Sequence, residues 1–308
     1  MNKIALAIHG GAGTILRSSM TAELEREYRG GLENALRTAW EILRVGGNAL
    51  DAVEAAVVEL ENFPLFNAGR GSVFTHEGKN EMDAAIMDGK DRRAGAVAFI
   101  KNIKNPIHLA RLVMEKTEHV LLAGEGAIEF AREMKIESEP DEYFFTEHRY
   151  RQLLSAIEED RVQLDHTSDR RSLGTVGAVA CDKDGNLAAA TSTGGMTNKK
   201  FGRVGDTPII GAGNYADNAT CAASCTGHGE FFMLGVTAYD LAARMKYKNL
   251  NLAQAAKETI DHLTEIGGEG GLIAVDRAGN VVLPFNSEGM YRGFVLENGE
   301  SRIEIYRD

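Results

Sequence analysis

The chain has 308 residues, 44% hydrophobic and 26% charged, which is the balance of a globular protein and excludes a disordered chain. Its 34 glycines show no three-residue period, which excludes collagen. No apolar run reaches the roughly 18 residues of a membrane span, so we expect no membrane partner. The net charge of −11 argues against a nucleic-acid partner. The three cysteines follow no disulfide or zinc pattern, which indicates a cytoplasmic protein.

The first half of the chain predicts strands separated by helix pairs. Apolar residues at three-to-four spacing predict helices over 21–45, 48–62, 106–116 and 124–134, the second capped by Asn48. Strands are expected over 3–8, 81–88, 94–100 and 119–122, with a glycine-rich loop at 66–72.

Residues 135–172 differ from their surroundings in composition. They are rich in charged residues and poor in aliphatic ones, which predicts a helix near 146–159 within an otherwise solvated, mobile linker. A long mobile stretch inside one domain indicates a functional or processed segment.

The second half is richer in strands. The turn at 182–186 joins strands over 176–180 and 187–191, and a similar turn at 276–280 joins strands over 272–275 and 281–285. Helices are expected between these hairpins, over 230–246 and 251–266. The simplest packing of all these elements is an α/β (α+β) fold with two sheets face to face and helices outside both, a four-layer αββα sandwich.

The glycines of residues 9–13 follow the first strand, but they do not form a dinucleotide-binding loop. Ile15 stands where the third glycine of that motif is needed. No Gly-x-Ser-x-Gly elbow occurs in the chain either, which argues against an esterase site. Two interpretations stay open for this segment: a tight turn where two backbones approach, or a support beside an active site.

Hydroxyl and glycine residues are densest between positions 174 and 230. A threonine at a chain N-terminus can act as a nucleophile, because its α-amine, with a pKa of about 7.7–8.0, removes the hydroxyl proton. Thr175 meets the local demands: a charged segment before it leaves room for a cut, Gly174 offers an unhindered carbonyl, and a strand follows. This pattern favours cleavage of the chain between Gly174 and Thr175.

Several short motifs occur together: His9-Gly10-Gly11, Asn67-Ala68-Gly69, Met82-Asp83-Ala84, Met87-Asp88-Gly89, Gly174-Thr175-Val176-Gly177, 191–195, 202–206, Gly211-Ala212-Gly213 and 226–230. With them the sequence closely resembles the plant-type L-asparaginase/isoaspartyl peptidase family of N-terminal nucleophile (Ntn) hydrolases, over nearly its whole length. The resemblance implies one Ntn-hydrolase domain over 1–308, cut into an α subunit (1–174) and a β subunit (175–308). Two such pairs would form an (αβ)2 homo-oligomer.

The resemblance also implies roles for the site residues. Thr175 becomes the nucleophile and, through its new amine, the base, and Thr193 lies beside it and tunes that amine. Arg203 anchors the substrate α-carboxylate, for which its planar fork is suited. Asp206 pairs with the substrate α-ammonium.

Further residues are implied in the same way. Thr226 and Gly227 form the oxyanion hole, Gly229 offers a carbonyl to the substrate amine, and Asn67 orients the surroundings of the nucleophile. No catalytic cofactor is implied. A structural sodium ion would be bound by main-chain carbonyls, and oxygen ligands suit such a hard cation. The carbonyls implied are those of Leu60, Glu61, Phe63, Phe66, Ala68 and Arg70.

The implied reaction is hydrolysis of L-asparagine and of β-aspartyl (isoaspartyl) dipeptides with release of L-aspartate. Three alternatives share the fold: a glycosylasparaginase, a taspase-like protease and a non-enzymatic binding relative. The first would carry a secretory signal and an aspartate at position 174, and the second a longer linker. The third would have lost its nucleophile or its anchor, whereas Thr175 and Arg203 are present. The sequence does not rank asparagine against isoaspartyl peptides.

Overall fold

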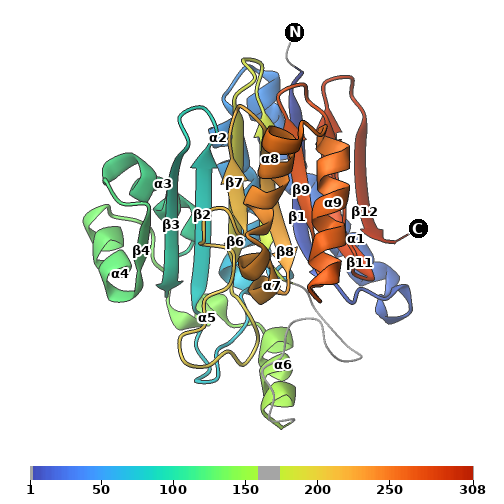
Figure 1. Cartoon of the computed structure of the whole chain (residues 1–308). Coiled ribbons are helices and arrows are strands. Elements are labelled where there is room, and N and C mark those ends of the chain that lie inside the picture. Colours follow the sequence, from blue (N-terminus) through green and yellow to red (C-terminus); the bar gives the residue numbers. More distant parts are fainter. Residues whose placement is uncertain (1–2, 159–173, 308) are drawn as a thin grey trace.

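The computed structural model describes residues 3–158 and 174–307, and Figure 1 traces them as two stacked sheets with helices outside. The larger sheet has the strand order β12-β11-β1-β5-β6-β2-β3-β4, and the smaller one has the order β10-β9-β8-β7. The strands are β1 Ala5–Gly13, β2 Met82–Asp88, β3 Arg93–Ile100, β4 Leu121–Ala123, β5 Val176–Cys181, β6 Leu187–Thr193, β7 Asn214–Ala216, β8 Cys221–Gly227, β9 Gly270–Asp276, β10 Val281–Val282, β11 Gly289–Leu296 and β12 Ser301–Tyr306.

Helices cover the outer face of each sheet. Helices α1, α2 and α3 pack on the larger sheet, and α8 and α9 pack on the smaller one, which confirms the four-layer αββα arrangement (Figure 1). The helices are α1 Ala22–Arg44, α2 Ala49–Asn62, α3 Pro106–Lys116, α4 Gly124–Glu133, α5 Asp141–Phe144, α6 Glu147–Glu158, α7 Gly229–Gly235, α8 Thr237–Lys248 and α9 Leu252–Glu265.

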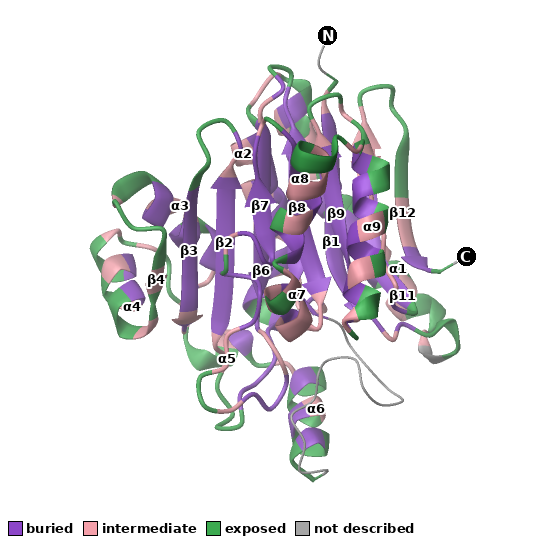
Figure 2. Cartoon of the chain, viewed as in Figure 1, coloured by how far each residue is buried: buried purple, intermediate pink, exposed green. Residues whose placement is uncertain are grey.

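Strand alternation divides the interior into two cores. Along β1, Leu6 and Ile8 face the core under α1–α3, whereas Ala5 and Ala7 face the core between the sheets. The second core is lined by many alanines, whose small side chains let the sheets pack closely. Figure 2 shows the central strands buried and the outer helix faces and the edge strand β12 more exposed.

Local signals fixed the helix starts correctly. The Thr21 hydroxyl accepts the backbone N–H of Leu24 at the start of α1, and the Asn48 side chain accepts that of Asp51 at the start of α2.

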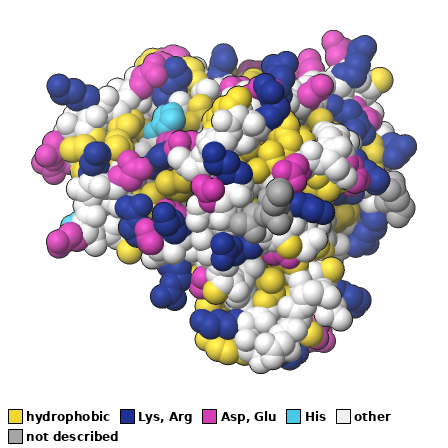
Figure 3. All heavy atoms as spheres, turned by 90° about the horizontal axis from the view of Figure 1, so that it is seen from above, with side chains coloured by type: hydrophobic (Ala, Val, Ile, Leu, Met, Phe, Trp, Pro, Cys, Tyr) yellow, Lys and Arg dark blue, Asp and Glu magenta, His cyan; other side chains and the backbone are white. Residues whose placement is uncertain are grey.

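No described helix has the length and hydropathy to cross a bilayer. Acidic and basic side chains intermingle on the face seen in Figure 3.

Three expectations were wrong in part. The strand expected over 3–8 continues to Gly13 as β1, because a bulge between His9 and Gly11, with φ of +118° at Gly11, lets it run on, so residues 9–13 are not the tight turn that was one of the two open interpretations. The single helix expected over 230–246 is two, α7 and α8, because Val236 is left-handed with φ of +46°.

The third concerns the linker expected over 135–172, within which the helix expected near 146–159 is confirmed as α6. Residues 141–158 form α5 and α6, which bury Phe144 and Leu153. The guanidinium of Arg149 in α6 donates to the carbonyls of Gly71 and Leu65, at 2.9 and 3.2 Å. This part of the segment is therefore packed structure, and the prediction for 159–172 lies outside the described residues.

Candidate active site

Thr175 and Thr193 meet where two neighbouring strands of the larger sheet bring them together. Thr175 directly precedes β5, Thr193 ends β6, and the register pairs Val176 with Ser192. The Thr175 hydroxyl donates to the Thr193 hydroxyl at 3.2 Å. Both side chains are buried, so this contact lies inside the protein and not on its surface.

A small cavity adjoins this pair of hydroxyls. Its lining brings together six of the residues predicted for the site with four others: Gly174, Thr175, Thr193, Arg203, Asp206 and Gly227, then Gly195, Met196, Gly205 and Thr207. The free volume is about 20 Å³, enough for about one water molecule. Roomier hollows of about 580 and 540 Å³ lie beside β10, and none of the predicted site residues lines them.

Arg203 is held in place by a carboxylate. Its Nε and Nη2 atoms donate to the two carboxylate oxygens of Glu230, each at 2.9 Å. His228 Nε2 lies 3.4 Å from the same carboxylate. This bidentate pair uses one edge of the guanidinium and leaves the Nη1 side toward the cavity wall at Gly205, so Arg203 can still bind a second carboxylate.

Glycines 205 and 229 make room for the charged side chains. A Cβ at Gly205 would lie 2.8 Å from Arg203 Nη1, and one at Gly229 would lie 2.7 Å from Asp206 Oδ1 and 2.9 Å from Arg203 Nη2. Any side chain at these positions would displace the guanidinium or the carboxylate. Gly229 therefore lies against both, although it does not line the cavity itself.

Asp206 is a buried carboxylate with an unused acceptor. Its side chain is 4% exposed and Oδ2 has no hydrogen-bond partner. Burial raises the pKa of Asp206 from 3.8 to about 7, against the opposing effect of the Arg203 charge. Such a group gains most from a cation that enters the cavity, because the cation favours the ionised form.

Thr226 and Gly227 end β8 next to the cavity. Gly227 lines the cavity, and the fully buried Thr226 hydroxyl accepts the backbone N–H of Ala12 at 3.3 Å.

Asn67 does not line the cavity but contacts Gly195, which does. Its side chain accepts the N–H of Val73 at 2.9 Å and donates to the carbonyl of Gly195 at 2.8 Å, so it fixes the turn after Thr193.

Comparison with known proteins shows the family of this chain. A family model described as asparaginase matches residues 2–305. The chain belongs to the asparaginase family. It is 50% identical to the isoaspartyl peptidase of Escherichia coli, over 100% of this chain and 98% of that protein. It is 46% identical to the human isoaspartyl peptidase/L-asparaginase, over 94% and 92%, and 42% identical to the probable isoaspartyl peptidase/L-asparaginase 2 of Arabidopsis thaliana, over 98% of each.

His9 has a role in this asparaginase-family fold that the sequence left open. Its Nδ1 lies 3.0 Å from the Thr175 carbonyl and its Nε2 lies 2.8 Å from the Ser224 hydroxyl. Burial lowers the pKa of His9 to about 3, against a backbone hydrogen bond that raises it, so the ring is neutral. Because a carbonyl only accepts, Nδ1 carries the proton and Nε2 accepts from Ser224. His9 therefore holds the main chain at Thr175 in place.

Two other contacts were missed by sequence analysis. Glu230 belongs to a recognised motif of the family, but its clamp on Arg203 requires the loop and α7 to meet in space. Lys199 is buried and donates to the carbonyls of Gly194 and Glu81, at 3.0 and 2.7 Å. Burial lowers its pKa, and its only sequence signal was its place between two quoted motifs.

Proposed function

We propose that this chain is an autoprocessed threonine hydrolase that cleaves L-asparagine and β-aspartyl dipeptides and releases L-aspartate. The observation that carries the proposal is the cavity where the Thr175 hydroxyl, 3.2 Å from that of Thr193, lies with Arg203 and Asp206. The names of the relatives support the same substrates. No described contact favours a glycosylasparaginase, a taspase-like protease or a non-enzymatic relative over this function.

The first step is cleavage of the chain itself. The Thr175 hydroxyl attacks the Gly174 carbonyl, the Gly174–Thr175 amide bond breaks as an ester forms, and water hydrolyses that ester. The products are residues 1–174, ending in a carboxylate, and 175–308, beginning with the free Thr175 amine. Gly174 lines the small cavity, so its departure would make room for the substrate.

The amine then acts as base for amide hydrolysis. With a pKa of about 7.7–8.0 it takes the hydroxyl proton as Thr175 attacks the substrate β-carbonyl. The Thr226 hydroxyl and the Gly227 N–H stabilise the oxyanion. Ammonia or an amino acid leaves with a proton from the ammonium group, and water hydrolyses the acyl-enzyme to release aspartate.

The charged end of the substrate is recognised apart from the reacting amide. Arg203, oriented by Glu230, binds the α-carboxylate, while Asp206 and the Gly229 carbonyl bind the α-ammonium. Placing the two charges in this way aligns the β-carbonyl with Thr175, and holding reactants in one geometry is a large part of catalysis.

A sodium ion fits the loop between α2 and residue 71. No group of three or more His, Cys, Asp or Glu side chains among the described residues could hold a metal. The carbonyls of Leu60, Phe63, Phe66 and Ala68 each accept one backbone N–H, which leaves each a second lone pair. With those of Glu61 and Arg70 they would provide uncharged oxygen ligands. The ion would stabilise the loop that carries Asn67.

We further propose that two processed pairs associate as (αβ)2. The partners are then small substrates and a second copy of the chain. The cytoplasmic location stays a prediction from the three cysteines, which are free and buried.

Intact mass under denaturing conditions tests the proposal first. We expect two fragments of about 19 and about 15 kDa from the 33.4 kDa chain, the smaller beginning at Thr175. Release of ammonia from asparagine and of aspartate from β-aspartyl dipeptides should accompany cleavage. A fully cleaved protein without either activity would contradict the proposed function.

A further inference from the structure

Two adjacent residues of the cavity wall carry buried oxygens without a partner. Among the described residues, five buried side-chain atoms lack any hydrogen bond: Asp83 Oδ2, Thr197 Oγ1, Asp206 Oδ2, Thr207 Oγ1 and Asn214 Oδ1. Only Asp206 and Thr207 of these line the cavity beside Thr175. A buried polar atom left unpaired costs about 1–3 kcal/mol, so both atoms have reason to bind what enters the cavity.

A turn holds the two side chains in place. The carbonyl of Asp206 accepts the backbone N–H of Ile209 at 3.0 Å, and Thr207 is 1% exposed. Both oxygens are buried and have no hydrogen-bond partner. They belong to two residues of the cavity lining, which also contains Arg203.

The inference rests on the proposed function, which places an α-ammonium group at this wall. An ammonium group has three N–H donors. The proposed function gives it two acceptors, the Asp206 carboxylate and the Gly229 carbonyl, and leaves one donor for a further acceptor. We propose that Thr207 is a third substrate-binding residue and that its Oγ1 accepts the remaining N–H of the substrate α-ammonium.

Thr207 belongs with the residues that select an α-amino acid. Its hydroxyl distinguishes L-aspartate and L-asparagine from analogues that keep the carboxylates but lack the amine. It has no part in the attack of Thr175. Removing it weakens binding and leaves the chemical step and the self-cleavage intact.

The test compares two competitive inhibitors of asparagine hydrolysis, L-aspartate and succinate, which differ only in the α-amine. In Thr207→Val the inhibition constant for L-aspartate should rise about 10-fold to 100-fold, as expected for a hydrogen bond to a charged group, and that for succinate should change less than about twofold. The KM for asparagine should rise in parallel with the inhibition constant for L-aspartate, while kcat should fall little.

Matched variants make the comparison specific. Thr207→Ser keeps the hydroxyl and should recover most of the affinity for L-aspartate. Thr197→Val removes an equally buried and unpaired hydroxyl outside the cavity lining, and should alter neither inhibition constant. Should Thr207→Val fail to cleave itself, Thr207→Ala, which removes the hydroxyl without adding a methyl group, is measured instead.

The outcomes separate this inference from the proposed function. An equal loss of affinity for L-aspartate and for succinate in Thr207→Val would mean that the hydroxyl contacts a carboxylate or only supports the fold. An unchanged affinity for both would mean that the hydroxyl does not contact the ligand. Either result overturns the inference. A wild-type protein that is cleaved but does not hydrolyse asparagine overturns the proposed function itself.

Discussion

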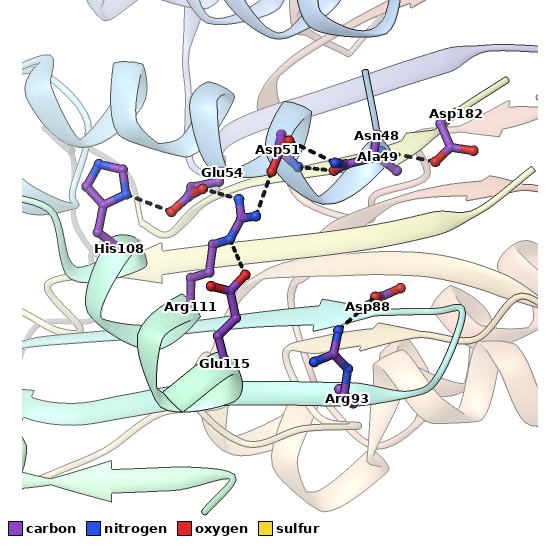
Figure 4. A network of polar contacts seen from close by, with 10 residues as sticks. All are labelled: Asn48, Ala49, Asp51, Glu54, Asp88, Arg93, His108, Arg111, Glu115 and Asp182. Carbon is purple, nitrogen blue, oxygen red and sulfur yellow. Dashed lines mark hydrogen bonds and ion pairs between the residues drawn. The ribbon is translucent and has the colours of Figure 1, made fainter. Parts of the chain in front are cut away.

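Two polar clusters in this molecule differ in how completely they are paired. Between α2 and α3, Arg111 contacts Asp51, Glu54 and Glu115, and His108 contacts Glu54, as Figure 4 shows. In the cavity, Asp206 and Thr207 carry buried oxygens with no partner. The first cluster holds two helices together, and the second has binding capacity left.

The comparison shows why a dense group of charges is a poor guide to a site. The cluster on α2 and α3 has more titratable groups, yet the Arg111 guanidinium is surrounded by three carboxylates and needs no ligand. Protein interiors rarely leave polar atoms unpaired, so unpaired atoms on residues that also line a cavity point to a ligand more directly than a dense group of charges does.

The largest loss of activity is expected at the cavity, when the proposed nucleophile is removed. Thr175→Ala takes away the hydroxyl that cleaves the chain and attacks the substrate, so the protein should stay one chain and lose at least about a thousandfold in kcat. Intact mass and ammonia release measure both effects. A cleaved or active variant would remove Thr175 from its role.

The anchor comes next. Arg203→Ala should be cleaved normally but lose about 100-fold or more in kcat/KM for asparagine, because the α-carboxylate and Glu230 then lack their cation. Steady-state kinetics on the processed protein measures this loss. An unchanged kcat/KM would place the carboxylate elsewhere.

The pH dependence of activity should reflect the titration of groups at the cavity and not of the cluster between α2 and α3. Burial raises the pKa of Asp206 to about 7. The α-amine that the proposed cleavage frees at Thr175 has an ordinary pKa of about 7.7–8.0. Because each group costs about tenfold per pH unit below its pKa, we expect kcat/KM to fall about tenfold per unit just below the pKa of the amine and up to about 100-fold per unit below pH 7, where both groups take up protons. A flat profile down to pH 5 would contradict the amine as base.

The same raised pKa of Asp206 predicts that replacing this carboxylate stabilises the folded protein at high pH. Asp206 ionises at 3.8 in the unfolded chain and at about 7 when folded, so its contribution to stability is present below pH 3.8 and is lost as the pH rises toward 7. Asp206→Asn should therefore stabilise the fold at pH 8 by up to about 4 kcal/mol, with no gain near pH 4. Urea unfolding in the uncleaved Thr175→Ala background measures it, and a less stable variant at pH 8 would contradict the unpaired carboxylate.

The smallest effect on activity is expected at the paired cluster. Arg111→Met leaves three carboxylates without their cation, so unfolding in the Thr175→Ala background should cost about 1–3 kcal/mol less. In the otherwise unchanged protein, kcat/KM per processed molecule should stay within about twofold. A large loss of kcat/KM would mean that this cluster acts on the site.

Local sequence signals predicted much of the fold. Asn48 and the turn at 182–186 act through neighbours in the chain, and their helix start and hairpin were placed correctly. The bulge at Gly11 and the break at Val236 were missed, because tertiary packing imposes backbone conformations that spacing does not reveal.

The candidate site divides in the same way. The motifs contain the residues that line the cavity except Met196 and Thr207. The contact of His9 with Ser224, in contrast, joins positions 215 apart in the chain. The clamp of Glu230 on Arg203 likewise depends on where α7 lies. Such pairs are properties of the folded chain and leave no trace in spacing.

The strand order of the larger sheet has a consequence for how the processed protein assembles. Strand β1 lies between β11 and β5, and β2 pairs with β6. If the chain is cut between Gly174 and Thr175 as proposed, β1 and β2 belong to one fragment and β5, β6 and β11 to the other, so the two fragments share one hydrogen-bonded sheet. After denaturation the cut protein should then refold only when two fragments meet, at a rate that falls with fragment concentration, whereas the uncut chain refolds at a rate independent of concentration.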